Sequence, residues 1–152
     1  MIQRIQTLYL LAALALCIAC LCMPIAHFIV IESMEKVDMY NLWLVSEGQH
    51  LFFFCPVMMG IMVVASAVIF LDIWLFTQRA LQMRLASLGM ILIACWYIAY
   101  GVISYLVTAE MQATYRPHWT AALPAAALIL LYLAFRGILK DEMLVRSLDR
   151  LR

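Results

Sequence analysis

The sequence predicts an all-α integral membrane protein, a four-helix bundle formed by one transmembrane domain over residues 1–152. Four long apolar runs take up most of the chain, at about residues 5–31, 51–76, 85–108 and 119–135. The hydrophobic fraction is 68% and the mean hydropathy is +1.01, whereas soluble domains are roughly 45–50% apolar. Because about 20 apolar residues span a bilayer core as a helix, we expect lipid to surround most of this chain.

The first run, residues 5–31, is predicted to be a retained membrane span. It is too long for the apolar region of a secretory signal, and a single arginine, Arg4, precedes it. Cys17 and Cys20 have the spacing of a thiol-redox motif. Apolar surroundings disfavour the thiolate that such chemistry needs, so we interpret these cysteines as packing residues.

The second and third runs, residues 51–76 and 85–108, are joined by a short segment, residues 77–84. A connection this short makes the two predicted helices antiparallel neighbours. The segment between the first two runs, residues 32–50, mixes acidic with apolar and aromatic residues. It is expected to lie against the bilayer surface, but the sequence does not predict its conformation.

Asp72 is the only ionisable residue well inside a predicted span. Placing such a group at mid-bilayer costs on the order of 2.5–3.5 kcal/mol. One interpretation is an interfacial salt bridge with Arg84 or Arg136, or a helix cap. The other is a proton-handling or ion-handling residue of a small transporter or channel subunit.

The fourth run, residues 119–135, is followed by a basic tail, residues 136–152, which is predicted to continue as a helix. Glu142 and Arg146 are four residues apart in the order that stabilises a helix. A narrow leucine stripe on this tail can lie on lipid headgroups or dock in a partner's groove.

The basic residues indicate how the chain is oriented. If both termini and the 77–84 segment share one side, that side holds eight of the ten basic residues. Only Lys36 and Arg116 lie opposite. Because positively charged loops stay in the cytoplasm, both termini are predicted to be cytoplasmic.

Three histidines, His27, His50 and His118, are predicted at the external ends of helices one, two and four. Imidazole is the commonest protein ligand for metals, so one hypothesis is an external metal-binding or haem-binding redox module. No His-Glu-x-x-His spacing supports it, and the one Cys-x-x-Cys pair, Cys17 and Cys20, lies inside a predicted span rather than beside the histidines. Ordinary interfacial histidines are the other interpretation, and we predict no cofactor.

Both ends of the chain resemble a known family. The residues that carry the resemblance are 1–10 (MIQRIQTLYL), Leu133-Ala134, 140–152 (KDEMLVRSLDRLR) and, in the turn, 79–82 (RALQ). They are similar to the domain-of-unknown-function 4293 family of Bacteroidetes-type bacteria, and the likeness covers the whole chain. The resemblance implies a small bacterial inner-membrane protein of four helices, with no activity, substrate or cofactor to carry over.

The leading hypothesis is a non-enzymatic adaptor or accessory subunit that presents a basic cytoplasmic face to a protein partner or to anionic lipid. Nucleic acid is not an expected partner, because acidic residues are interleaved with the basic ones in the tail. Small residues in the spans allow close helix packing within one chain or between copies, so the sequence is also compatible with a homo-oligomer. The residues predicted to form the basic face are Gln3, Arg4, Arg79, Gln82, Lys140, Arg146, Arg150 and Arg152.

Overall fold

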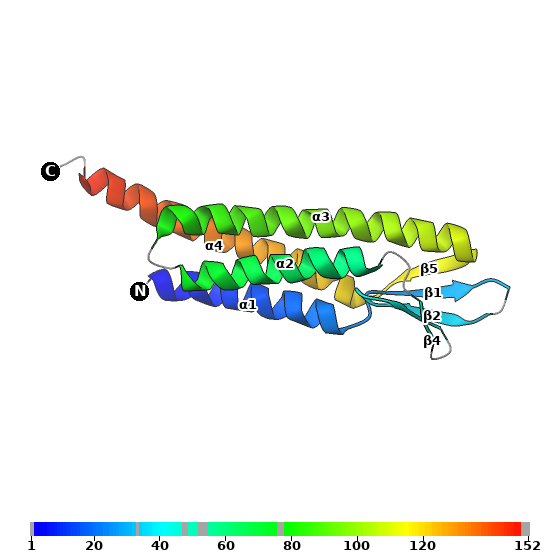
Figure 1. Ribbon diagram of the computed structural model, residues 1–152. Helices are drawn as coiled ribbons and strands as arrows, with labels where there is room; N and C mark the ends of the chain where they lie inside the picture. The colour runs from blue at the N-terminus through cyan, green and yellow to red at the C-terminus, as the bar shows by residue number, and fades with distance from the viewer. Residues whose placement is uncertain (1, 33, 47–48, 52–54, 76–77, 150–152) are drawn as a thin grey trace.

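The computed structural model describes residues 2–32, 34–46, 49–51, 55–75 and 78–149. Four long helices run side by side, and a small sheet lies at one end of them (Figure 1). We call this end the sheet end and the opposite one, where the chain begins, the terminal end. The helices are α1 (Ile2–Cys22), α2 (Cys55–Trp74), α3 (Arg79–Met111) and α4 (Leu123–Asp149).

The four helices form a ring in which α1 contacts α2 and α4, and α3 contacts the same two helices. Each helix buries one stripe of residues spaced three or four apart, as the helical repeat requires. Several of the buried residues are small, such as Ala13, Ala65 and Ala127, and small side chains let apolar helices approach closely. The predicted packing role of small residues therefore holds for these three, whereas Ala15, Ala67, Ala125 and Ala126 are exposed.

The outside of the bundle is apolar as well. Leu8, Ile91, Ile98 and Ile129 are large exposed side chains on three of the helices. Among the described residues, four helices are long and apolar enough to cross a membrane, at Ile5–Cys22, Cys55–Trp74, Ala80–Met111 and Trp119–Met143. An apolar exterior over these lengths is compatible with a location in a membrane.

The helix boundaries differ from the predicted ones. α1 ends at Cys22 rather than residue 31, and α2 spans Cys55–Trp74 rather than residues 51–76. α3 extends the predicted 85–108 helix at both ends to Arg79–Met111, and α4 merges the fourth span with the tail as far as Asp149. A short 3-10 helix, η1 (Trp119–Ala122), precedes α4.

The fold is mostly helical, with the four predicted helices, but it is not all-α. Among the described residues, the segments between α1 and α2 and between α3 and α4 form a five-stranded antiparallel sheet. Its spatial order is β4-β3-β2-β1-β5. The strand β1 takes the residues that were expected to complete the first helix, and three more strands occupy the segment 32–51. The strands are β1 (Ala26–Val30), β2 (Lys36–Met39), β3 (Leu44–Ser46), β4 (Gln49–Leu51) and β5 (Ala113–Pro117).

One face of the sheet lies toward the end of α3 that reaches past α1 and α2, and β5 contacts this helix (Figure 1). Phe28, Val37 and Leu44 are buried in the same apolar cluster as Ile103 and Val107 of α3. Successive side chains of a strand point to opposite faces. The residues between the buried ones therefore lie on the other face, away from α3.

Candidate functional site

At the terminal end, α1 is joined to the extension of α4 by a buried side chain. Gln6 Nε2 donates a 2.8 Å hydrogen bond to Asp141 Oδ2, and Gln6 is almost fully buried. A Cβ at Gly137 would lie 3.1 Å from Gln6 Cγ. The absence of a side chain at position 137 thus makes room for Gln6 between the two helices.

Asp72 lies at the same end, and it is fully buried. Neither carboxylate oxygen has a hydrogen-bond partner among the described residues. Arg84 and Arg136, the partners predicted for a salt bridge, are both exposed. The predicted salt bridge is therefore wrong for this structure, because the carboxylate points into the bundle while both guanidinium groups stay outside it.

Gln82, predicted to belong to a partner-binding face, is also buried. Its Nε2 atom donates a 3.4 Å hydrogen bond to the backbone carbonyl of Asp72, and it links the end of α2 to the start of α3. This side chain faces the interior, so it contributes to helix packing rather than to an accessible surface.

The other residues of the predicted basic face lie at the terminal end or beyond it. Lys140 is exposed on the extension of α4. Gln3 and Arg4 lie in the first turn of α1, Arg79 begins α3, and Arg146 lies in α4, but the structure describes only their backbone. Arg150 and Arg152 lie outside the described residues.

At the sheet end, cross-strand neighbours form a row on the face away from α3. From β5 to β4 the row reads Arg116, His27, Asp38, Val45 and His50. His27 Nδ1 lies 2.6 Å from Asp38 Oδ1. The row combines acidic, basic and imidazole groups on a surface that the sequence alone did not reveal.

The fold brings two of the three predicted histidines together. The rings of His27 and His118 are in edge contact, with centroids 4.8 Å apart. His50 is three strands away from His27, about 14 Å at the usual strand spacing, and its ring lies 4.9 Å from that of Trp43. Within the described ranges, no group of three or more His, Cys, Asp or Glu residues is arranged to hold a metal ion.

A buried polar network joins the sheet to the bundle. Asn41, in the turn between β2 and β3, donates a 2.7 Å hydrogen bond to the Cys20 carbonyl at the end of α1. Its Oδ1 accepts a 2.8 Å bond from the indole N–H of Trp96 in α3. The Trp96 ring in turn stacks on Tyr100, at a centroid distance of 5.3 Å.

A shallow groove of about 310 Å³ lies between α3 and β5. The hydroxyls of Tyr100 and Tyr115 are 2.7 Å apart at its edge, and Ser104 Oγ is buried without a hydrogen-bond partner among the described residues. The sequence did not predict this groove, because it depends on how β5 folds back on α3.

The fold defines a class of protein, a ring of four membrane-type helices that carries a small antiparallel sheet at one end. The chain belongs to the DUF4293 family, described as a domain of unknown function, whose model matches residues 2–151. The family resemblance expected from the two ends of the sequence is thereby confirmed. No curated protein matches the chain.

Proposed function

We propose that the protein is a non-enzymatic adaptor or accessory subunit of a bacterial inner membrane, anchored by its four helices. In this proposal, the extension of α4 binds a cytoplasmic protein partner. The observation that carries the proposal is that α4 continues without a break to Asp149, well beyond the apolar run that ends near residue 135. In Figure 1 this extension projects past the terminal end of the other helices.

The distribution of basic residues supports the orientation. Eight of the ten Lys and Arg residues belong to the chain termini, the start of α3 or the extension of α4. Positive charge near the ends of spans favours the cytoplasmic side. The α4 extension would then lie in the cytoplasm, and the sheet would lie outside.

Exposed apolar residues on the extension favour a protein partner over lipid. Residues 136–152 carry five basic and three acidic side chains, so the acidic residues offset much of the positive charge. Binding to an anionic membrane surface depends on an excess of Lys and Arg. The exposed Leu139 and Met143 are four residues apart on one helix face, a spacing suited to a groove on another protein.

Site-specific photo-crosslinking in living cells tests the proposal. A photoreactive amino acid replaces Met143, which is 57% exposed, or Ile129 in the span, which is 60% exposed and serves as the matched control. We expect a discrete protein adduct from position 143 and none from position 129. The adduct should vanish when Lys140 and Arg146 are both replaced by Glu and persist in the Lys36→Glu chain, whose change lies on β2.

Truncation after Leu139 provides a second readout from the same cells. The partner identified by the adduct should co-purify with the full chain through a tag inserted at residues 47–48, between β3 and β4, and should be lost on truncation. If the shortened chain reaches the membrane at the normal level and retains the same partner, the adaptor proposal is wrong.

A small transporter or channel subunit is the second candidate, and the burial of Asp72 favours it. A buried carboxylate without a hydrogen bond costs several kcal/mol in an apolar interior, and a proton or cation bound at Asp72 would remove that cost. Intramembrane ionisable residues often mark ion pathways. Equal proton and cation flux through proteoliposomes of the native and Asp72→Asn chains would reject this candidate.

A further inference from the structure

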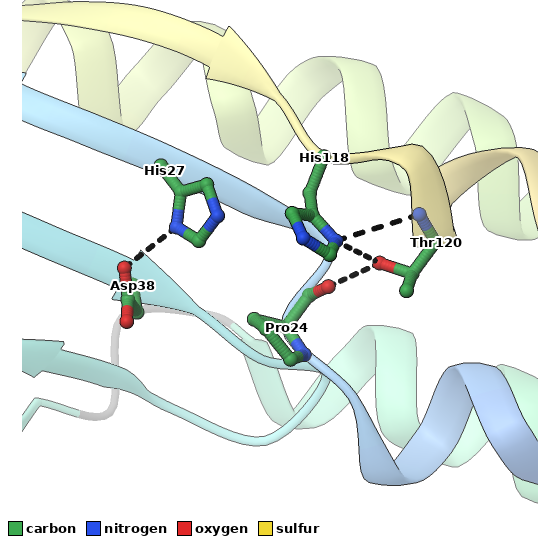
Figure 2. Close-up of polar contacts among 5 residues, drawn as sticks. All are labelled: Pro24, His27, Asp38, His118 and Thr120. Carbon is green, nitrogen blue, oxygen red and sulfur yellow. Dashed lines mark hydrogen bonds and ion pairs between the residues drawn. The ribbon is translucent and has the colours of Figure 1, made fainter.

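The contact between His27 and His118 places two imidazoles from distant parts of the sequence side by side. His27 lies on β1, and His118 follows β5, which pairs with β1. Figure 2 shows the two rings next to each other, each with its Nδ1 atom bound to a neighbouring residue on the outer side of the pair. These neighbours determine which nitrogen of each ring carries the proton.

The hydrogen bonds around Thr120 assign the proton of His118. The Thr120 hydroxyl bonds to the Pro24 carbonyl, which can only accept, so the single hydroxyl proton points there. The 2.8 Å contact between Thr120 Oγ1 and His118 Nδ1 then requires a proton on Nδ1. The Thr120 amide N–H also points at Nδ1 as a donor, at 3.5 Å. A proton on Nδ1 excludes that bond, and the 2.8 Å contact with the hydroxyl is the shorter of the two.

Asp38 fixes the proton of His27 in the same way. Its carboxylate Oδ1 lies 2.6 Å from His27 Nδ1, and an ionised carboxylate is only an acceptor, so Nδ1 donates. In the neutral forms of both rings, Nε2 therefore carries a free lone pair. A histidine that binds a metal through one nitrogen commonly donates its other N–H to a carboxylate or another oxygen.

The geometry of the pair suits a shared ion. In Figure 2, the Nε2 atom of each ring is on the side that faces the other ring. Zn–N bonds of about 2.0–2.1 Å place the centroids of two coordinated imidazoles about 4.5–5.2 Å apart for ligand angles between about 90° and 110°. The observed separation is 4.8 Å.

We propose that His27 and His118 form a binding site for a divalent transition-metal ion of the kind that prefers imidazole, such as Zn²⁺, Cu²⁺ or Ni²⁺. Nε2 of each ring supplies one ligand. Asp38 holds His27 in position and places one negative charge beside the ion. The positive charge of Arg116, the cross-strand neighbour of His27, acts against binding of the cation. Water or an external ligand would complete the coordination, because the described residues offer no third His, Cys, Asp or Glu in a common cluster.

The site differs from the predicted three-histidine module, since His50 takes no part in it. It is also independent of the adaptor proposal, because it lies at the opposite end of the bundle from the α4 extension. Either proposal can therefore fail without the other.

The experiment is a Zn²⁺ titration of the full chain in mild detergent, after chelator treatment and without a histidine tag. ¹⁵N-histidine NMR reports which ring nitrogen binds the ion, and it separates histidine ligation from binding to the five cysteines. We expect the Nε2 resonances of two histidines to shift together at one Zn²⁺ per chain, and the third histidine to stay unchanged. Unchanged histidine resonances at saturating Zn²⁺ would overturn the proposal.

Four variants assign the ligands. His27→Gln and His118→Asn should each weaken Zn²⁺ binding by more than about ten-fold. Asp38→Asn, which removes the carboxylate bound to His27 Nδ1, should weaken it by roughly 10–100-fold. Asn at position 118 is a favourable helix N-cap residue, so the start of η1 should be preserved. His50→Gln is the matched control and should bind like the native chain; an equal loss in this variant would place the site elsewhere.

Discussion

Asn41 lies in a turn between two short strands, yet its side chain is buried in the core that joins sheet and helices. Its side-chain amide makes two hydrogen bonds: it donates to the Cys20 carbonyl and accepts from the indole N–H of Trp96. Both partners are buried, and a buried polar group without a partner is costly. One polar side chain therefore fixes the position of the β2–β3 turn relative to α1 and α3.

Replacing Asn41 with Ala should destabilise the protein by roughly 1–3 kcal/mol or more, because the Trp96 N–H and the Cys20 carbonyl would both lose their partner. Tyr97→Phe is the comparison, since it removes a single 2.7 Å bond to the Ala121 carbonyl and should cost about 0.5–1.5 kcal/mol. Thermal unfolding in detergent, followed by circular dichroism, measures both. An Asn41→Ala chain as stable as Tyr97→Phe would contradict this role.

Sequence reasoning found some functional candidates at this scale and missed others. Asp72 was easy to identify as a candidate because it is a single acidic residue in an apolar run. Its expected partners, Arg84 and Arg136, were wrong because the spacing of residues does not show in which direction their side chains point. Asn41 and Trp96 are 55 residues apart, so no local pattern connects them. The sequence grouped His27 and His118 with His50 at one end of the predicted helices. It could not show which two of the three meet, because that depends on the pairing of β1 with β5.

At the scale of elements, the helices were predictable and the strands were not. The fourth span and its helical tail were recovered up to Asp149, because both share a continuous helical pattern. The strand β1 was absorbed into the first helix, since hydropathy does not distinguish an apolar strand from an apolar span. Two local signals were present in the sequence: Pro24, which disfavours helix at the residue before it, and the alternation of polar and apolar residues over 36–39 (KVDM).

The length of α3 has a consequence for the sheet. Its 33 residues make a helix about 50 Å long, whereas a bilayer core is about 30 Å thick. The outer part of α3 can therefore reach beyond the core, and this is the part on which the sheet packs. The left-handed conformation of Gln112, with φ of 45°, ends α3 and turns the chain back into β5.

For the whole molecule, we propose that the four helices cross a bacterial inner membrane with the sheet outside and the α4 extension inside. The arrangement of both ends supports it, since the chain termini and most basic residues lie opposite the sheet. The adaptor role of the extension and the outward position of the histidine pair both depend on this orientation.

Labelling with a membrane-impermeant maleimide tests this orientation. One chain carries Thr114→Cys on β5 and another carries Lys140→Cys on the α4 extension; both positions are exposed, and the unmodified chain measures labelling of the native cysteines. We predict that Cys at position 114 is labelled once the outer membrane is permeable, whereas Cys at position 140 is labelled only after the inner membrane is opened. Labelling of both positions from the same side, or in the reverse order, would show that this orientation is wrong.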